Sequence, residues 1–225
     1  MDGFLQYWRA LVCSDDSLPL FEAALSIAQD EYPQLPMHEV LARVDGFALA
    51  LRRRISTLRQ PIARVDALRE HFADELGFRG NANDFHDPEN SYLNRVIERR
   101  LGIPISLSVL YLEIAELAGV QACGVGFPGH FLVRHDIGGR ALIVDVFAGA
   151  RVLTHDELEY RLLPYASGDR DEASRMLGTV LPAASGRQIL ARMLRNLRAI
   201  HRERGDALRL AAVERRIVVL EETEG

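Results

Sequence analysis

The residues that could do chemistry together are a histidine and an aspartate in the second half of the chain, His130 and Asp145. Both belong to stretches rich in β-branched and aromatic residues that flank Gly138-Gly139, a pattern typical of a hairpin with a two-residue turn. With that turn, Leu132 faces Asp145, and His130 falls on the same face one diagonal step away. A carboxylate beside an imidazole fixes the tautomer of the ring and raises its basicity, which is the orienting half of a nucleophilic triad.

A buried helix is predicted to precede these strands. Pro104 suits the first turn of a helix, where its missing N–H would have no partner anyway. Apolar residues then recur at spacings of three and four as far as Ala118, and Gly119 suits a left-handed cap. We therefore expect a core helix from 104 to 118, followed by strands within 120–127, 131–135 and 140–147.

The rest of the chain is predicted to be mostly helical. Apolar stripes indicate helices within 20–30, 40–55 and 61–76 before the site, and two more within 187–220 that meet at Gly205-Asp206. Thr154 with Glu157 three positions later is typical of a helix N-terminus. The predicted fold class is α+β, with a helical N-terminal part (1–78), a core (79–165) in which a helix packs on a small antiparallel sheet, and a C-terminal helical hairpin (185–225).

Several ordered segments carry a resemblance to a known family. They are Phe78-Arg79-Gly80-Asn81, the run 87–96, Arg99-Arg100, the run 102–107 and the run 126–134. In this order they resemble the SirB-type branch of the transglutaminase-like superfamily, from about Leu18 to Leu163. The segment from Arg187 onward resembles the helical tail of such proteins and a single tetratricopeptide-type unit. The resemblance implies a papain/transglutaminase-like core and a tetratricopeptide-like C-terminal hairpin.

The resemblance also implies which residues form the site. In active members a Gly-Val-Cys element opens the core helix, and its cysteine attacks an amide or peptide carbonyl with the help of a histidine and an aspartate. Here His130 matches the histidine, Asp145 matches the aspartate, and Pro104 stands where the cysteine would be. Because proline has no nucleophile, the resemblance carries over the fold but not the activity.

Ser106 and Cys123 are weaker candidates for the nucleophile, whereas Ser108 is set too deep to be one. Ser106 lies about 200° around the helix from Pro104 and suits a role as a cap that accepts an N–H. Ser108 is on the same face as Pro104 but one turn deeper. Cys123, on the preceding strand, is the nearest cysteine in sequence, and a lone strand cysteine is more often a small buried apolar residue.

The polar loop 79–90 leads into the next helix and is predicted to shape a cleft. The resemblance makes Asn90, Tyr92 and Ser106 candidates for binding in that cleft. His86, Asp87 and Glu89 cluster in the same loop, but turn formation and helix capping explain them, and we expect no metal ion there.

Composition excludes several classes of function. All 27 basic residues are arginine, which rules out a Schiff-base lysine and a P-loop lysine. The net charge of −5 argues against a general nucleic-acid binder. Two distant cysteines provide neither a disulfide framework nor a zinc motif. We expect no cofactor, no nucleic acid and no membrane association, and a cytoplasmic location.

Two functions stay open. The first is a non-catalytic, regulatory protein that lacks the catalytic cysteine and binds a peptide or protein partner in its cleft. The alternative is a hydrolase or amide transferase that uses His130 and Asp145 with a non-standard nucleophile, either Ser106, Cys123 or an activated water. The sequence favours the first because the base is present and the thiol is not.

Overall fold

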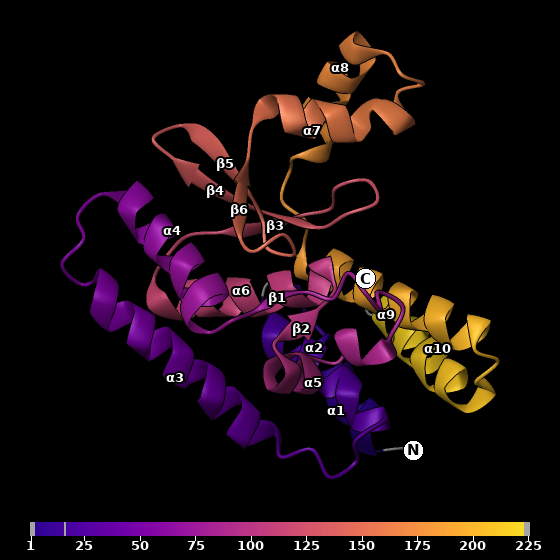
Figure 1. Ribbon diagram of the computed structural model, residues 1–225. Coiled ribbons are helices and arrows are strands. Elements are labelled where there is room, and N and C mark those ends of the chain that lie inside the picture. Colours follow the sequence, from indigo (N-terminus) through magenta and orange to yellow (C-terminus); the bar gives the residue numbers. More distant parts are fainter. Residues whose placement is uncertain (1–2, 16, 223–225) are drawn as a thin grey trace.

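The computed structural model describes residues 3–15 and 17–222 (Figure 1). Its α-helices are α1 (Gly3–Leu11), α2 (Leu20–Ser26), α3 (Met37–Ile55), α4 (Pro61–Glu70), α5 (Leu93–Arg99), α6 (Pro104–Ala118), α7 (His155–Leu162), α8 (Arg170–Val180), α9 (Gly186–Glu203) and α10 (Ala207–Glu222). Short helical turns are η1 (Ile27–Asp30), the π-helical η2 (His71–Glu75), η3 (Pro88–Asn90) and η4 (Leu163–Tyr165). The strands are β1 (Arg79–Gly80), β2 (Leu101–Gly102), β3 (Cys123–Val125), β4 (Leu132–Ile137), β5 (Arg140–Asp145) and β6 (Arg151–Leu153).

The larger sheet is antiparallel, with the strand order β3-β4-β5-β6. The β4–β5 hairpin turns at Gly138 and Gly139, whose φ angles of 57° and 80° are those that a tight hairpin turn requires. Ile137 pairs with Arg140, as that turn demands, so the predicted register is confirmed. A separate two-residue pair, β1 with β2, is parallel and was not predicted.

Helices cover both faces of this sheet. Side chains alternate between faces along a strand, so neighbouring residues enter different cores. Val133 and Val144 belong to the main core beside α6, whereas Leu132 and Ile143 belong to a second core with residues of α7 and α8. In Figure 1, α7 and α8 lie on the side of the sheet opposite to α6. His130 and Asp145 therefore sit at one end of a layer that is covered on both sides.

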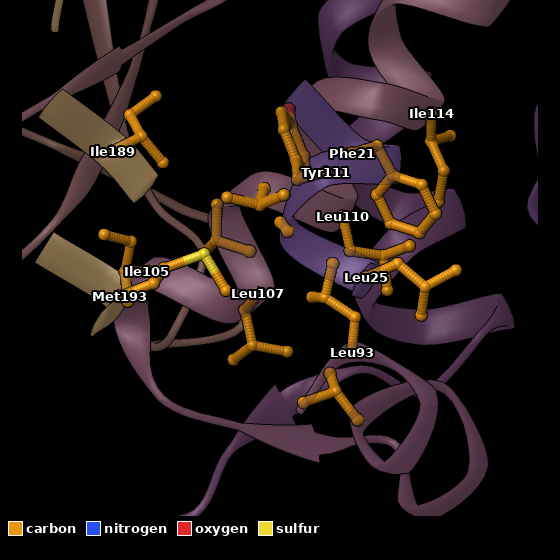
Figure 2. Close-up of a cluster of buried hydrophobic side chains, with 14 of the residues drawn as sticks. Phe21, Leu25, Leu93, Ile105, Leu107, Leu110, Tyr111, Ile114, Ile189 and Met193 are labelled. Carbon is orange, nitrogen blue, oxygen red and sulfur yellow. The ribbon is translucent and has the colours of Figure 1, made fainter. Parts of the chain in front are cut away.

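Helix α6 is the centre of the main core and has the predicted bounds. It begins at Pro104, after Ile103 in an extended conformation, and ends before Gly119 in the left-handed conformation. Tyr111 and Ile114 are among its fully buried side chains. Such a helix, apolar on most sides, requires cover from several elements. Figure 2 shows this cluster, in which the labelled side chains come from α2, α5, α6 and α9.

The C-terminal helices pack on each other and on the N-terminal helices. Trp8 of α1 donates its indole N–H to the carbonyl of Arg216 in α10 at 3.1 Å. The buried guanidinium of Arg216 binds Asp30 at 2.6 Å. The main core thus takes side chains from all three predicted parts of the chain, whose boundaries stay a prediction. Residues 1, 2, 16 and 223–225 of those parts lie outside the described residues.

The mixture of many helices and small sheets agrees with the predicted α+β class. Some elements were missed: α1, α8, β6 and the β1–β2 pair. The predicted helix over 61–76 ends as an α-helix at Glu70 and continues as the π-helical η2. Thr154 caps α7 as predicted, since its hydroxyl accepts the Glu157 N–H and the Glu157 carboxylate accepts the Thr154 N–H. Within 3–15 and 17–222, no helix is long and apolar enough to cross a membrane.

Glu113 of α6 is a carboxyl group whose surroundings disfavour its charged form. It is half-buried where α6 packs against α2 and α3, and its nearest charges are other carboxylates, those of Glu116, Asp45 and Glu22. Burial and these like charges raise the pKa of Glu113 from 4.5 to about 7. Because its pKa is higher in the folded protein, Glu113 favours folding at low pH, and this contribution is lost as pH rises from about 4.5 to about 7.

We expect Glu113→Gln to stabilise the protein at pH 8 but not at pH 4. The gain at pH 8 should be about 1 to 2 kcal/mol, since the side chain is only partly buried. Denaturant unfolding at both pH values measures this difference. Glu203→Gln, which alters an exposed glutamate of α9, is the control and should show no such pH dependence. Equal effects of Glu113→Gln at both pH values would contradict the assignment.

Candidate functional site

His130 and Asp145 are in direct contact, as the hairpin register predicted. The Nε2 atom of His130 lies 2.9 Å from Oδ1 of Asp145. The side chain of Asp145 is 2% exposed and that of His130 is 20% exposed. The carboxylate is thus buried beneath a ring whose edge reaches solvent. With Nε2–H donated to the carboxylate, the lone pair of Nδ1 is left for another group, and Nδ1 has no hydrogen bond among the residues that the structure describes.

Asp145 is held by two further donors. Arg161 of α7 donates from Nη2 to Oδ2 at 2.8 Å, and the backbone N–H of Ala148 donates to Oδ1 at 3.1 Å. Burial by itself raises the pKa of Asp145, but the hydrogen bonds and charges of His130 and Arg161 outweigh it and hold the pKa below its usual range. Asp145 is therefore a charged anchor for the ring. Arg161 was not recognised in the sequence, where nothing marks it among many arginines.

One aromatic side chain packs on the His130 ring, and a second packs on the first. The rings of His130 and Phe147 meet edge to face, with centroids 6.0 Å apart, and Phe85 packs on Phe147 at the same distance. Phe147 in turn lies against Gly80 of β1, where any side chain would clash with the ring. Phe85 and Phe147 were not predicted as site residues, although their loop was.

The start of α6 is connected to Phe147 through the β1–β2 pair. Gly80, which supports Phe147, pairs with Gly102 of β2, two residues before Pro104. Pro104 itself is buried in the first turn. The contacts therefore connect Phe147 to the segment that begins the helix. That the His130 ring faces Pro104 stays a prediction.

The hydroxyl groups of α6 are enclosed. Ser106 is fully buried, and its oxygen donates to the carbonyl of Asn90 at 2.5 Å and accepts the N–H of Ile103 at 3.1 Å. Ser108 is also fully buried, and its hydroxyl has no partner among the described residues. Ser106 thus has the capping role that its position suggested, and neither hydroxyl is exposed to a ligand.

Cys123 is set apart from His130. It pairs with Arg134 on β4, four positions beyond His130, and its charged neighbours are Arg134 and Asp136. Burial raises the pKa of the Cys123 thiol, which disfavours the reactive thiolate. The geometry thus does not support Cys123 as a nucleophile that His130 would activate.

The loop 81–90 is built around Asn90. This fully buried side chain donates to the carbonyl of Asp84 at 2.6 Å and accepts from Asn81 at 3.1 Å. Tyr92 turns away from this loop, to His201 of α9, whose Nε2 lies 3.2 Å from its hydroxyl. Direct binding of a ligand, as predicted for Asn90 and Ser106, does not fit their burial, because both shape the loop from beneath. Tyr92 lines a different pocket, between η1 and α10.

The acidic residues of the same loop have protein partners. Asp87 accepts the N–H of Glu89 and binds Arg99 at 2.7 Å, which fits the predicted capping. No group of three metal-binding side chains occurs in the part of the chain that the structure describes.

Comparison with known proteins decides the family. The model of the transglutaminase-like superfamily matches residues 38–195, which include α3 to α8 and the His130–Asp145 pair. The chain belongs to this superfamily. A UPF0162 protein of Xylella fastidiosa (strain 9a5c) is 40% identical over 198 residues, which are 88% of this chain and 70% of that protein.

Two further relatives are similar to the chain at lower identity. A UPF0162 protein of Pseudomonas aeruginosa is 29% identical over 201 residues, covering 89% of this chain and 72% of that protein. F-box only protein 21 of Homo sapiens is 33% identical over 149 residues, which are 63% of this chain and 22% of that protein. No solved structure matches the chain.

We expect Asp145→Asn to destabilise this transglutaminase-like protein by about 2 to 4 kcal/mol, because it leaves the Arg161 guanidinium without its buried counter-charge. Denaturant unfolding near neutral pH measures the change. Asp136→Asn is the matched control, since that aspartate also binds an arginine but is 61% exposed. It should cost no more than about 0.5 kcal/mol. Equal costs for both substitutions would show that Asp145 is not the anchor described here.

Pro104→Cys tests whether position 104 is the vacated nucleophile position of the superfamily. In a background of Cys13→Ser and Cys123→Ala, the new thiol would stand at a helix N-terminus and, if position 104 is the vacated one, within reach of His130. We expect its pKa to fall below the usual value of about 8.5, and to return toward it when His130→Ala is added. The rate of alkylation by iodoacetamide against pH measures this pKa, and a small reagent is needed because position 104 is buried.

The loss of proline should cost only about 0.4 to 1 kcal/mol, so the variant should stay folded. A folded variant with an ordinary thiol pKa, unchanged by His130→Ala, would show that Pro104 does not replace the cysteine.

Proposed function

We propose that this chain is a transglutaminase-like protein without a catalytic cysteine, which binds a peptide or protein partner at the surface around His130. The observation that carries the proposal is at the start of α6. The position that the sequence resemblance matches to the superfamily's cysteine, Pro104, is buried, and the hydroxyls of Ser106 and Ser108 are fully enclosed. Nucleophilic catalysis needs a reactive group within hydrogen-bond reach of its base.

The surface beside His130 supports binding. Phe85 and Tyr165 are large aromatic residues that are 43% and 52% exposed. The hydroxyl of Tyr165 lies against Gly129, next to His130, and leaves no room for a side chain there. Exposed aromatic rings beside a polar group that can accept a hydrogen bond are features of polypeptide-binding surfaces.

Two finer assignments belong to this proposal. The ordered motifs around Gly102–Leu107 and Gly126–Arg134 support membership of the SirB-type branch. The packing of α9 against α10 supports a tetratricopeptide-like hairpin with a regulatory rather than a catalytic role. One such unit is too short for a solenoid, so it packs on the rest of the protein.

The Nδ1 atom of His130, which has no hydrogen bond to a described residue, favours a second candidate. Its partner nitrogen is fixed by Asp145, so Nδ1 could act as a general base toward a water molecule or a substrate hydroxyl. This is the hydrolase or amide transferase with a non-standard nucleophile. The enclosed hydroxyls and the separate Cys123 argue against a protein nucleophile, which leaves water.

A peptide library displayed on phage and selected against the full chain tests the binding proposal. We expect synthetic copies of the selected peptides to bind at least about tenfold more weakly to His130→Ala and to Phe85→Ala, because truncating a central aromatic contact costs more than 1 kcal/mol. Fluorescence anisotropy measures the affinities. Leu208→Ala is the matched control, since it removes an apolar side chain that is 80% exposed on α10.

Peptides that bind both variants as tightly as the unaltered chain would refute a partner site at His130. Turnover of fluorogenic amides or esters that depends on His130 would replace the proposal by the hydrolase. Phe85→Ala distinguishes loss of binding from loss of folding, because an exposed side chain can be truncated without unfolding the protein.

A further inference from the structure

Helix α9 carries a row of arginines with no carboxylate partners. Arg192, Arg195 and Arg198 recur every three residues, so successive guanidinium groups project about 4.5 Å apart along the helix. None of the three forms an ion pair with a described residue. Other arginines near the site, such as Arg161 and Arg99, do form ion pairs. In a chain of net charge −5, this row is a local reversal of sign.

A pocket of about 430 Å³ opens beside this row. Its lining includes Arg192, Arg195 and Gln188 of α9 together with Phe131, Val180 and Pro182. Its lining contains no carboxylate. The pocket therefore combines apolar walls with two positive charges.

Arg192 joins the pocket to the turn that carries His130. Its Nη2 donates to the carbonyl of His130 at 2.8 Å and to that of Phe127 at 3.3 Å, and its guanidinium lies over the ring of Phe131. A ligand held at Arg192 would therefore lie next to the His130 turn.

No carboxylate among the described residues forms an ion pair with either guanidinium group at the pocket. Arg192 is half-buried, and its burial and the charge of Arg195 lower the pKa of its guanidinium. An anion in the pocket would relieve both effects, and arginine binds carboxylates with two parallel hydrogen bonds.

We propose that the pocket and the arginine row of α9 bind an acidic peptide segment, whose carboxylates pair with Arg192, Arg195 and Arg198 and whose chain continues to His130. This inference rests on the proposed function, since it names the kind of partner bound beside His130. Three charges in a row fit several Asp or Glu side chains better than one terminal carboxylate. The apolar walls fit a peptide better than a nucleic-acid backbone, and the net charge of −5 would repel a nucleic acid.

The test uses the full chain and a fluorescein-labelled twelve-residue peptide that alternates Glu and Ala, acetylated and amidated at its ends. Matched probes are the same peptide with Gln for Glu, and a single-stranded DNA of about twelve nucleotides. We expect the Glu peptide to bind at least about tenfold more tightly than the Gln peptide at low salt, and to weaken as salt is raised. Arg195→Gln with Arg198→Gln should weaken Glu-peptide binding about tenfold.

Arg52→Gln with Arg53→Gln is the charge-matched control. These exposed arginines lie on α3, away from α9 (Figure 1), and their replacement should leave binding unchanged. The inference would be overturned if the Gln peptide bound as tightly as the Glu peptide, or if the DNA bound more tightly than the Glu peptide. It would also be overturned if the Arg52→Gln, Arg53→Gln control lost as much affinity for the Glu peptide as the α9 double variant. Arg192→Lys keeps one donor for the His130 carbonyl and should weaken Glu-peptide binding less than the Arg195→Gln, Arg198→Gln variant. If neither variant bound the Glu peptide more weakly than the unaltered chain, the inference would be overturned.

The result of this peptide-binding assay can be distinguished from the result of the phage-library selection. Selected peptides that depend on His130 but contain no excess of Asp or Glu would overturn the acidic-segment inference and leave the partner site intact. Loss of both His130 dependence and acidic preference would overturn both.

Discussion

The site depends on one buried carboxylate. Asp145 comes from the end of β5, and its two oxygens receive donors from the His130 turn, from the Ala148 turn and from Arg161 on α7. A charge that is 2% exposed is stable only when it is paired and hydrogen-bonded. Each of these three segments is therefore held in place by the same group, and a shift in any one of them would leave an unpaired charge.

This constraint explains why the sheet must be covered on both faces. Arg161 reaches Asp145 only because α7 packs on the face that Leu132 and Ile143 present. The opposite face rests on α6, where Tyr111 binds His135 of β4 at 3.1 Å. The register of the hairpin is thus fixed from both sides, and a slip of one residue would send Asp145 toward α6 and away from Arg161.

Local patterns were enough to predict the parts that depend on local chemistry. The Gly138-Gly139 turn determined the hairpin register, and Pro104 with Gly119 bounded α6. The β1–β2 pair could not be found in this way, because two-residue strands carry no periodicity and form only after distant segments meet. Arg161, Phe147 and Phe85 were missed for the same reason: their roles come from tertiary contacts that no spacing in the sequence encodes. The burial of Asn90 and Ser106 likewise follows from how the loop folds over α6.

Helix α9 contacts both the main core and the His130 turn. α9 buries Ile189 and Met193 against the core around α6 (Figure 2), and from the same helix Arg192 binds the carbonyls of Phe127 and His130. These carbonyls flank Gly129, whose φ of 66° glycine adopts readily, and the His130 N–H donates to the Phe127 carbonyl at 3.0 Å, so Arg192 binds both ends of one closed turn. A displacement of α9 would therefore move the His130 turn through the two hydrogen bonds of Arg192. Arg192 and Asp145 thus hold the His130 turn from two sides, one through its backbone and the other through the imidazole.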